Sequence, residues 1–518
     1  MKSQLARLIP AVLALCVLNA AAVTRYVDLN CLSPTPPYTS WPTAATNIQD
    51  AIDAAVAGDL VLVTNGVYAT GGRTVGASPL TNRVAVTTPL TLQSVNGPDA
   101  TIIEGYQMPV TANGNAAVRC VYLASGASLN GFTLTNGATR TSSDIHGGGV
   151  YCQSVSATVS NSVVIGNSAY FFGGGVYQGT LTGCSLRTNI AYVGGGAYQS
   201  VLTDCSVIGN EARNGTAGSS ASGGGAYKGL LRNCQIIGNV APYGGGCVGD
   251  YSVEGIINCV IARNRANHGG GGYGGRFSNC TIVDNIATIS GGGVDSGGSA
   301  VINNSIAYFN SAPAGSNLFG VKMNYSCTTP PDFGAGSSVT NSPEFVDLAG
   351  GDYRLQSSSP CINAGLNQFA YRLTDSDGNP RIVGGTVDIG AYEFQSPASI
   401  LPYWWAQQYG LPTDGSADFT DPDADDMNNW GEWRSDTIPT NTLSVLRLVS
   451  ATNSAGGAKV TWQSVATRSY WVERATNLGS APSFSAIASN IAGVAGTKTF
   501  TDANATNGGP YFYRVGVQ

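Results

Sequence analysis

The chain has 518 residues, of which 43% are hydrophobic and only 11% are charged, and it contains 69 glycines. Such a composition is typical of a turn-rich β protein with a large apolar core. The net charge of −6 argues against nucleic acid or an anionic membrane as a partner.

The first residues have the pattern of a secretory signal peptide. Lys2 and Arg7 supply positive charge, residues 8–18 are apolar, and residues 20–22 are alanines. We expect cleavage after Ala22, so that residues 1–22 form the signal peptide. The mature protein is then secreted and either extracellular or associated with the cell surface or outer membrane. No later apolar run is long enough for a transmembrane helix.

Residues 23–58 are predicted to form an N-terminal cap. Thr46 and Gln49 make a capping box, residues 48–55 place apolar side chains on one helical face, and Gly58 ends the helix. The first coil of a β structure follows at residues 59–68, and residues 84–135 contain further strand patterns.

Residues 146–312 repeat one motif seven times. Each copy has three glycines and, about ten residues later, an apolar residue, a spacer, an Asn/Asp/Gly, a Cys or Ser, and a closing Asn. The triads begin at Gly147, Gly173, Gly194, Gly223, Gly244, Gly269 and Gly291. This period predicts a solenoid with two or three short strands per coil, because it is too short for a strand–helix–strand unit. A parallel β-helix is the expected fold.

Equivalent residues of stacked coils form columns. The Asn/Asp/Gly position predicts a left-handed corner, and the closing asparagines predict a ladder in which each buried amide satisfies the next. These are Asn167, Asn189, Asn210, Asn239, Asn264, Asn285 and Asn310. Five cysteines share one inward position, namely Cys184, Cys205, Cys234, Cys259 and Cys280. A disulfide or metal stack is one interpretation, and buried thiols that act as small apolar groups are the favoured one.

Aromatic residues form an outward column two residues beyond the glycine triads. Its members are Tyr151, Tyr177, Tyr198, Tyr227 and Tyr273. The column is either a platform on which sugar rings stack or a structural ladder that supports the glycine turns. His146 and His268 directly precede a triad, where a histidine is more often structural than catalytic.

Several segments resemble known families. Residues 46–68 resemble the opening of right-handed β-helices of the pectate-lyase-like class, and the triad repeats resemble those of polymorphic outer-membrane proteins. These resemblances imply a β-helix over residues 59–345. Residues 346–395 resemble the choice-of-anchor module that follows such helices, and residues 444–518 resemble a fibronectin type III β-sandwich. The expected class is therefore all-β: a right-handed parallel β-helix with a capping helix, followed by a small sandwich.

The linker of residues 396–443 contains an acidic motif with the spacing of an EF-hand-like calcium loop. Oxygen ligands fall at its first, third, fifth and twelfth positions, and a backbone carbonyl falls at the seventh. These are Asp421, Asp423, Asp425, Glu432 and, through its carbonyl, Met427. The loop resembles the calcium repeats of thrombospondin type 3 and dockerin segments, with Asp426 where glycine is usual. The alternative is a solvated acidic linker.

Enzymes of this fold act through acidic clusters with a basic residue, or through paired carboxylates. No stacked carboxylate pair emerges from the aligned repeats, so no catalytic residue is assigned. We expect a non-catalytic adhesion or display protein with structural calcium, whose partner is an extracellular polysaccharide or a host or neighbouring cell surface. The alternative is a lyase or hydrolase of acidic polysaccharide with its site near residues 70–145, and a carbohydrate-binding module is a third possibility.

Overall fold

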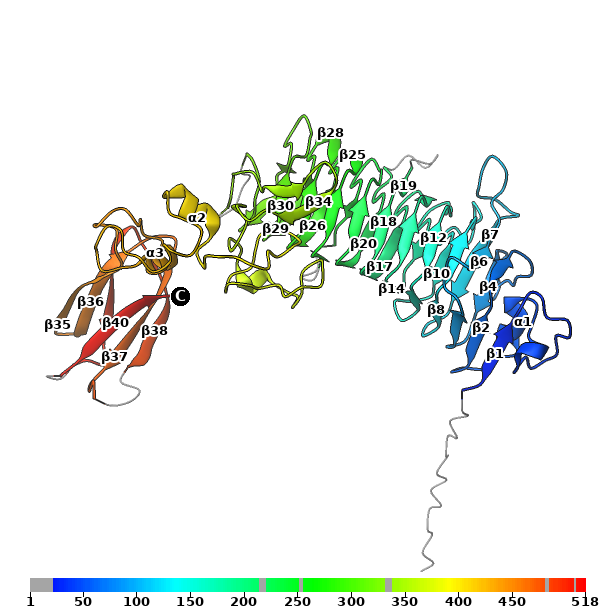
Figure 1. Cartoon of the computed structure of the whole chain (residues 1–518), viewed down its shortest axis with the longest axis horizontal. Coiled ribbons are helices and arrows are strands. Elements are labelled where there is room, and N and C mark those ends of the chain that lie inside the picture. Colours follow the sequence, from blue (N-terminus) through cyan, green and yellow to red (C-terminus); the bar gives the residue numbers. More distant parts are fainter. Residues whose placement is uncertain (1–21, 214–219, 251–254, 331–337, 480–483, 507–508) are drawn as a thin grey trace, which may run out of the picture.

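The computed structural model describes residues 22–213, 220–250, 255–330, 338–479, 484–506 and 509–518. The predicted signal peptide lies outside these residues except for Ala22. Figure 1 shows an elongated stack of β coils that starts at β1 (Thr24–Val27) and ends near two short helices and a separate pair of sheets. Within the described residues no helix is long and apolar enough to cross a membrane.

Parallel sheets form the sides of the solenoid, as the repeat period predicted. The larger sheet has 18 strands. Its strands are β1, β2 (Leu60–Val63), β4 (Thr81–Val86), β5 (Thr91–Ser94), β7 (Val118–Leu123), β8 (Ser128–Asn130), β10 (Val150–Cys152), β11 (Thr158–Ser160), β13 (Val176–Tyr177), β14 (Thr180–Thr182), β17 (Ala197–Thr203), β20 (Ala226–Arg232), β22 (Cys247–Val248), β23 (Ile256–Ile257), β26 (Gly272–Ser278), β29 (Val294–Asn303), β31 (Leu318–Phe319) and β32 (Lys322–Asn324). In most coils two short strands contribute to this sheet, and in others one long strand such as β17 or β20 takes the place of both. The fold is a right-handed parallel β-helix, with the hand normal for parallel crossovers.

A second sheet of ten strands forms another side of every coil. Its strands are β3 (Gly66–Tyr68), β6 (Thr101–Glu104), β9 (Thr133–Thr135), β12 (Val163–Ile165), β15 (Ser185–Arg187), β18 (Ser206–Ile208), β21 (Gln235–Ile237), β24 (Val260–Ala262), β27 (Thr281–Val283) and β30 (Ile306–Tyr308). Short parallel pairs add to a third side, and they are β16 (Ile190–Ala191) with β19 (Glu211–Ala212) and β25 (Arg265–His268) with β28 (Ile286–Ser290).

The motif copies align in the register that the sequence predicted. Val164 pairs with Leu186, and Leu186 pairs with Val207. The Asn/Asp/Gly corner has φ between 44° and 62° in every copy. A second left-handed corner precedes each closing asparagine, with φ between 49° and 67°. The sequence did not reveal this second corner, because residues as different as Gly166, Thr188 and Phe309 occupy it.

The closing asparagines form the predicted ladder. Each side-chain amide donates to the Oδ1 atom of the next asparagine at 2.9–3.1 Å, from Asn167 through Asn310. The last acceptor is Asn317, which extends the ladder by one rung. The glycine triads pack against it: a Cβ on Gly225 would lie 2.5 Å from the carbonyl oxygen of Gly246 and 3.1 Å from the side-chain amide nitrogen of Asn239. The triad therefore makes room for the ladder.

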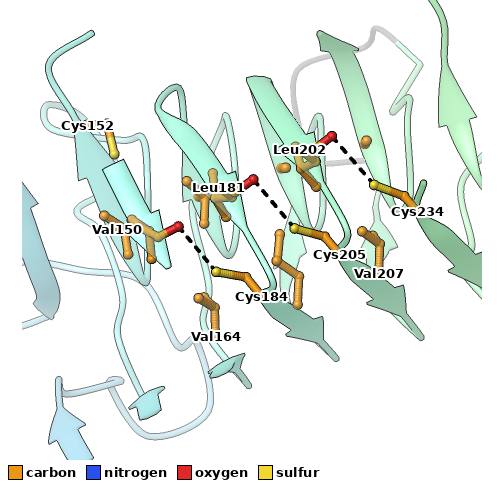
Figure 2. Packing of buried hydrophobic residues seen from close by; sticks show 14 of the residues in the cluster. Val150, Cys152, Val164, Leu181, Cys184, Leu202, Cys205, Val207 and Cys234 are labelled. Atoms are coloured by element: carbon orange, nitrogen blue, oxygen red, sulfur yellow. Dashed lines mark hydrogen bonds between the residues drawn. The ribbon is translucent and has the colours of Figure 1, made fainter. Parts of the chain in front are cut away.

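The inward cysteine column consists of buried free thiols. Figure 2 shows the thiols of Cys184, Cys205 and Cys234 pointing at carbonyl oxygens of the preceding coil. Neighbouring positions of the same face are Val164 and Val207, also buried. The column is thus part of the apolar core, which agrees with the favoured interpretation of these thiols.

The N-terminal helix differs from the prediction. Helix α1 (Ile48–Asp53) is short, and its N-cap is Asn47, whose side chain accepts a hydrogen bond from the backbone N–H of Asp50. The capping box of Thr46 and Gln49 and the helix end at Gly58 are therefore wrong. Gln49 instead exchanges two hydrogen bonds with the backbone of Ala85, which fastens the helix to β4. The single turn η1 (Trp41–Thr43) precedes it.

The segment after the solenoid packs on its outer side. It contains β33 (Phe345–Asp347) paired with β34 (Asp352–Leu355), and the single turn η2 (Asn367–Phe369). Corner asparagines of the last coils hold it: Asn258, Asn279 and Asn304 donate to backbone carbonyls of residues 374, 369 and 366. This module shares one apolar core with the outward faces of β24, β27 and β30.

Helices α2 (Tyr403–Gln408) and α3 (Asn429–Ser435) lead to the C-terminal sheets. One sheet contains β35 (Leu448–Ser454), β36 (Gly457–Ser464) and β39 (Gly496–Asp502), and the other contains β37 (Ser469–Ala475), β38 (Ser485–Ala492) and β40 (Phe512–Val517). Trp462 and Tyr470 fill the core between them. Strand β38 was not predicted from the sequence, because its residues show little apolar alternation.

Candidate functional site

The acidic motif folds as a compact loop between α2 and α3. Asp421 accepts backbone hydrogen bonds from Asp425 at 3.3 Å and Asp426 at 3.0 Å, and Asp425 accepts one from Met427 at 2.9 Å. Asp426 takes the left-handed conformation expected at this position, with φ of 71°. The loop thus turns back on itself and brings its alternate side chains to one side.

Carboxylate oxygens converge inside this loop. Ligand atoms of Asp421, Asp423 and Asp425 lie within 4.8 Å of one another. Both oxygens of Asp423 and of Glu432, and one oxygen of Asp425, are buried without a hydrogen-bond partner. Within the part of the chain that the structure describes, this is the one group of three or more such potential metal ligands.

Electrostatics at the loop favour a bound cation. Burial, and then the charges of Asp423, Asp425 and Asp421, raise the pKa of Glu432 to about 8, and its side chain is fully buried. Burial also raises the pKa of Asp425. Buried carboxylate oxygens that lie close together and lack hydrogen-bond donors raise the free energy of the fold unless a cation compensates their charge. An all-oxygen set of carboxylates suits calcium, which accepts six to eight oxygen ligands.

Three of the predicted ligands therefore lie together, and α3 carries Glu432 near enough for their charges to raise its pKa. The Met427 side chain lies against α3, where its sulfur accepts a hydrogen bond from Ser435 at 3.3 Å. Participation of the Met427 carbonyl stays a prediction. The sequence spacing was sufficient to find this cluster, because all its members lie within one short segment.

The loop precedes α3, which lies between the solenoid with its packed module and the C-terminal sheets (Figure 1). On one side, Asp418 accepts a hydrogen bond from the Ser399 hydroxyl, and the Ser399 carbonyl accepts one from Asn363 at 2.7 Å. On the other side, Arg468 of the sandwich donates to the carbonyl oxygens of Trp433 and Arg434 on α3, at 3.2 and 3.0 Å. A cation in the loop would therefore stabilise the connection between the two parts.

The outward tyrosines form a continuous stack over most of the solenoid. Tyr122, Tyr151, Tyr177, Tyr198 and Tyr227 follow one another at ring-centroid distances of 5.5, 5.0, 5.5 and 5.5 Å, with interplanar angles of 14° or less. Their rings are half-buried, and because each face covers the next, the edges and hydroxyls remain for solvent. Tyr122 was not predicted as a member of the column, because it precedes the first glycine triad.

Tyr273 does not continue this stack, because Val248 stands between it and Tyr227 in register. It lies edge-on to Tyr243, with ring centroids 5.2 Å apart at 79°. The predicted column of five therefore consists of four stacked members and one separate ring.

His146 belongs to an adjoining aromatic row. Its ring stacks on Phe172 at 4.7 Å and on Tyr177 at 5.0 Å. Burial and the nearby Arg119 cation lower the pKa of His146 to about 4. The imidazole is therefore neutral at pH 7 and acts as an aromatic rung.

Replacing His146 with phenylalanine, the residue at the equivalent position of the next coil, tests its role as an aromatic rung. The unfolded chain binds a proton at His146 below about pH 6.5, whereas the folded chain does so only near pH 4, so this group destabilises the fold as the pH falls between these values. His146→Phe should remove this loss, which at pH 4.5 is about 2–3 kcal/mol. Urea unfolding at pH 7 and pH 4.5 measures it: the variant's advantage over the wild type should grow at the lower pH. An advantage that is equal at both pH values contradicts the assignment.

His268 lies in a Ser–His–Asp cluster that lacks the order of a hydrolase triad. The Ser290 hydroxyl donates to Asp295 and lies 2.8 Å from Nδ1 of His268. In a nucleophilic triad the imidazole stands between the carboxylate and the hydroxyl. Here the hydroxyl stands between them, bound to the carboxylate, and Ser290 is almost fully buried. The cluster therefore has a structural role.

No protein-family model matches the chain, and no curated protein matches it. Among solved structures, the chain is similar to pectate lyase Pel9A, at 16% identity over 72% of this chain and 97% of that chain, with a TM-score of 0.44. It is also similar to pectin methylesterase PemA from Erwinia chrysanthemi, at 14% identity over 62% of this chain and 92% of that chain, with a TM-score of 0.27. These similarities concern the fold alone.

Proposed function

We propose that the chain is a secreted, non-catalytic β-helix protein that acts outside the cell or at its surface in adhesion or display, and that structural calcium stiffens its C-terminal joint. The observation that carries the calcium proposal is the group of unpartnered carboxylate oxygens of Asp423, Asp425 and Glu432 beside Asp421. The solenoid supports a structural role, because its closing asparagines hydrogen-bond to one another within the fold.

The non-catalytic part of the proposal is tested by an activity assay. The purified chain is incubated with calcium and a panel of uronic-acid polysaccharides, and unsaturated products are followed by their ultraviolet absorbance. Released reducing ends and methanol are measured in parallel, so that hydrolysis and ester cleavage are also detected. We expect no turnover above that of heat-denatured protein, and sustained turnover refutes the proposal.

Contact with carbohydrate belongs to the same proposal, with the tyrosine column as its surface. The faces of Tyr177 and Tyr198 are covered by their neighbours in the stack, so the contact proposed here is made by their ring edges and hydroxyls. Tyr177→Ala and Tyr198→Ala should each lower retention in polysaccharide-containing gels. Tyr106→Ala, which alters an exposed tyrosine outside the stack, should leave retention unchanged. Equal retention of all three variants and the wild type contradicts a contact here.

A second candidate function is a lyase or hydrolase of acidic polysaccharide near residues 70–145. The observation that favours it is Arg119, a buried guanidinium that lies beside His146 and over the Tyr151 ring at 5.0 Å. Its partners are neutral oxygens of Asn82, His146 and Gly147. Such a cation attracts anions, and turnover in the same activity assay, lost in Arg119→Gln, would establish this candidate in place of the first.

A further inference from the structure

A cleft of about 430 Å³ lies where three parts of the chain meet. Its walls come from residues 364–368 of the module beside the solenoid, from Trp404 of α2, from Trp430 and Trp433 of α3, and from Arg468 of the sandwich. Its size falls in the range of small-molecule sites. The cleft is separate from the tyrosine column, which lies on the coils.

Indole rings dominate one side of the cleft. Trp404, Trp430 and Trp433 are all half-buried, so each keeps part of its ring surface open. The ring centroids of Trp430 and Trp433 are 5.1 Å apart with an interplanar angle of 42°. Adjacent, tilted indoles with a polar rim are suited to the apolar faces and hydroxyl edges of consecutive sugar rings.

Two arginines, Arg434 and Arg468, are the charged side chains among the residues that line the cleft. Arg434 is exposed at the rim, with its guanidinium 5.9 Å from the centroid of the Trp430 ring. In the described part of the chain Arg434 forms no ion pair, and no Asp or Glu side chain lines the cleft, although the net charge is −6. Arg468 is already engaged by the carbonyls of α3. Arg434 is therefore the cation available to an anionic ligand.

We propose that this cleft binds an acidic saccharide, with sugar rings on Trp430 and Trp433 and a carboxylate at the guanidinium of Arg434. The inference deepens the proposed contact with polysaccharide by adding a site at the joint and a ligand class. Charge-assisted hydrogen bonds to Arg434 select acidic over neutral sugars, and the indoles contribute affinity for both.

The test is a calorimetric titration of the full mature chain with a galacturonic acid trisaccharide, and with the galactose trisaccharide of the same linkage. Calcium is kept in excess so that the sugar does not remove it from the loop. We expect saturable binding of the acidic sugar and about tenfold weaker binding of the neutral one. Arg434→Ala should reduce the difference to about twofold or less, and Trp433→Ala should abolish binding of both.

Matched controls are Arg447→Ala and Trp471→Ala, which alter an exposed arginine and a half-buried tryptophan of the sandwich outside the cleft. Both should bind as the wild type does. Trp433→Phe keeps an aromatic ring on α3 and should restore part of the affinity if Trp433→Ala disturbs the helix. A separate calcium titration of each variant reports whether the loop is intact.

The proposal is overturned if the folded wild type binds neither trisaccharide, or binds both equally. It is also overturned if Arg434→Ala and Trp433→Ala bind like the wild type. Loss of binding in Tyr177→Ala and Tyr198→Ala instead would place the sugar on the tyrosine column, in agreement with the proposed function but against this cleft.

Discussion

The Asp423→Ala variant is expected to lose calcium binding that the wild type shows in calorimetry. Both carboxylate oxygens of Asp423 are buried without a hydrogen-bond partner, so in the calcium proposal they act as ligands. Removing one ligand charge from a partly buried oxygen cage costs about 3 kcal/mol or more, which is a loss of affinity of about 100-fold. Glu432→Gln should have a similar effect, because the amide keeps the shape of the side chain but removes the charge of the twelfth position.

The matched control is Asp414→Ala. Asp414 is an exposed acid of the same linker, and among the described residues its side chain accepts hydrogen bonds from Ser416 alone. It should bind calcium like the wild type, which separates the effect of a ligand from that of general acidity. If Asp423→Ala and the wild type titrate equally, calcium does not bind in this loop and the segment is a solvated acidic linker.

Calcium should also protect the connection between the solenoid and the sandwich from proteolysis. Without a cation, repulsion among Asp421, Asp423, Asp425 and Glu432 opposes the packing of α3, to which Arg468 of the sandwich is bonded. A chelator should therefore speed proteolytic cleavage between the solenoid and the sandwich in the wild type. It should have little effect on Asp423→Ala, which is already without calcium.

The solenoid could be predicted from the sequence because its constraints recur. A left-handed corner such as Asn161 is informative once seven copies show Asn, Asp or Gly at the same place. The closing asparagines were similarly recognisable, since a buried polar residue that repeats needs a partner that repeats. Repetition turns weak local preferences into a register, and the strand pairing of Val164 with Leu186 confirms that register.

Contacts that occur once were not predictable in this way. The side chain of Gln49 bonds the backbone of Ala85 on β4 instead of capping its own helix, and no local sequence pattern indicates this contact. Arg119 and Tyr122 precede the repeats, so their places beside the aromatic rows follow only from the three-dimensional stacking of the irregular coils.

The two candidate sites illustrate the same difference. The acidic loop was predictable because its carboxylates occupy one segment of twelve positions. The cleft was not visible, because its walls at Trp404, Trp430 and Arg468 belong to elements that meet only after the module and the sandwich have packed against α2 and α3.

The asparagine ladder provides the largest expected loss of stability, in Asn239→Ala. The side chain of Asn239 is fully buried. Its Nδ2 donates to Asn264 at 3.0 Å and to the carbonyl of Val207 at 2.9 Å, and its Oδ1 accepts from the backbone N–H and side chain of Asn210 at 2.8 and 3.0 Å. Alanine leaves the buried Asn210 N–H without its acceptor and the Val207 carbonyl without this donor. It also removes one of two hydrogen bonds at the side chains of Asn210 and Asn264, which keep the Leu186 carbonyl and the backbone N–H of residue 239 as partners. At about 1–3 kcal/mol for each unsatisfied group, a loss of about 3–6 kcal/mol is expected.

The loss is measured as a shift of the urea midpoint at constant pH, with the slope compared so that a change in cooperativity is recognised. Asn267→Ala is the matched control, because Asn267 is an exposed asparagine of the same solenoid and should change the stability by less than about 0.5 kcal/mol. Asn239→Asp should be destabilising as well, since it keeps an acceptor but loses both donors and buries a charge. If Asn239→Ala unfolds within about 1 kcal/mol of the wild type, the ladder contributes little, and the stability of the coils comes from the apolar columns and backbone pairing alone.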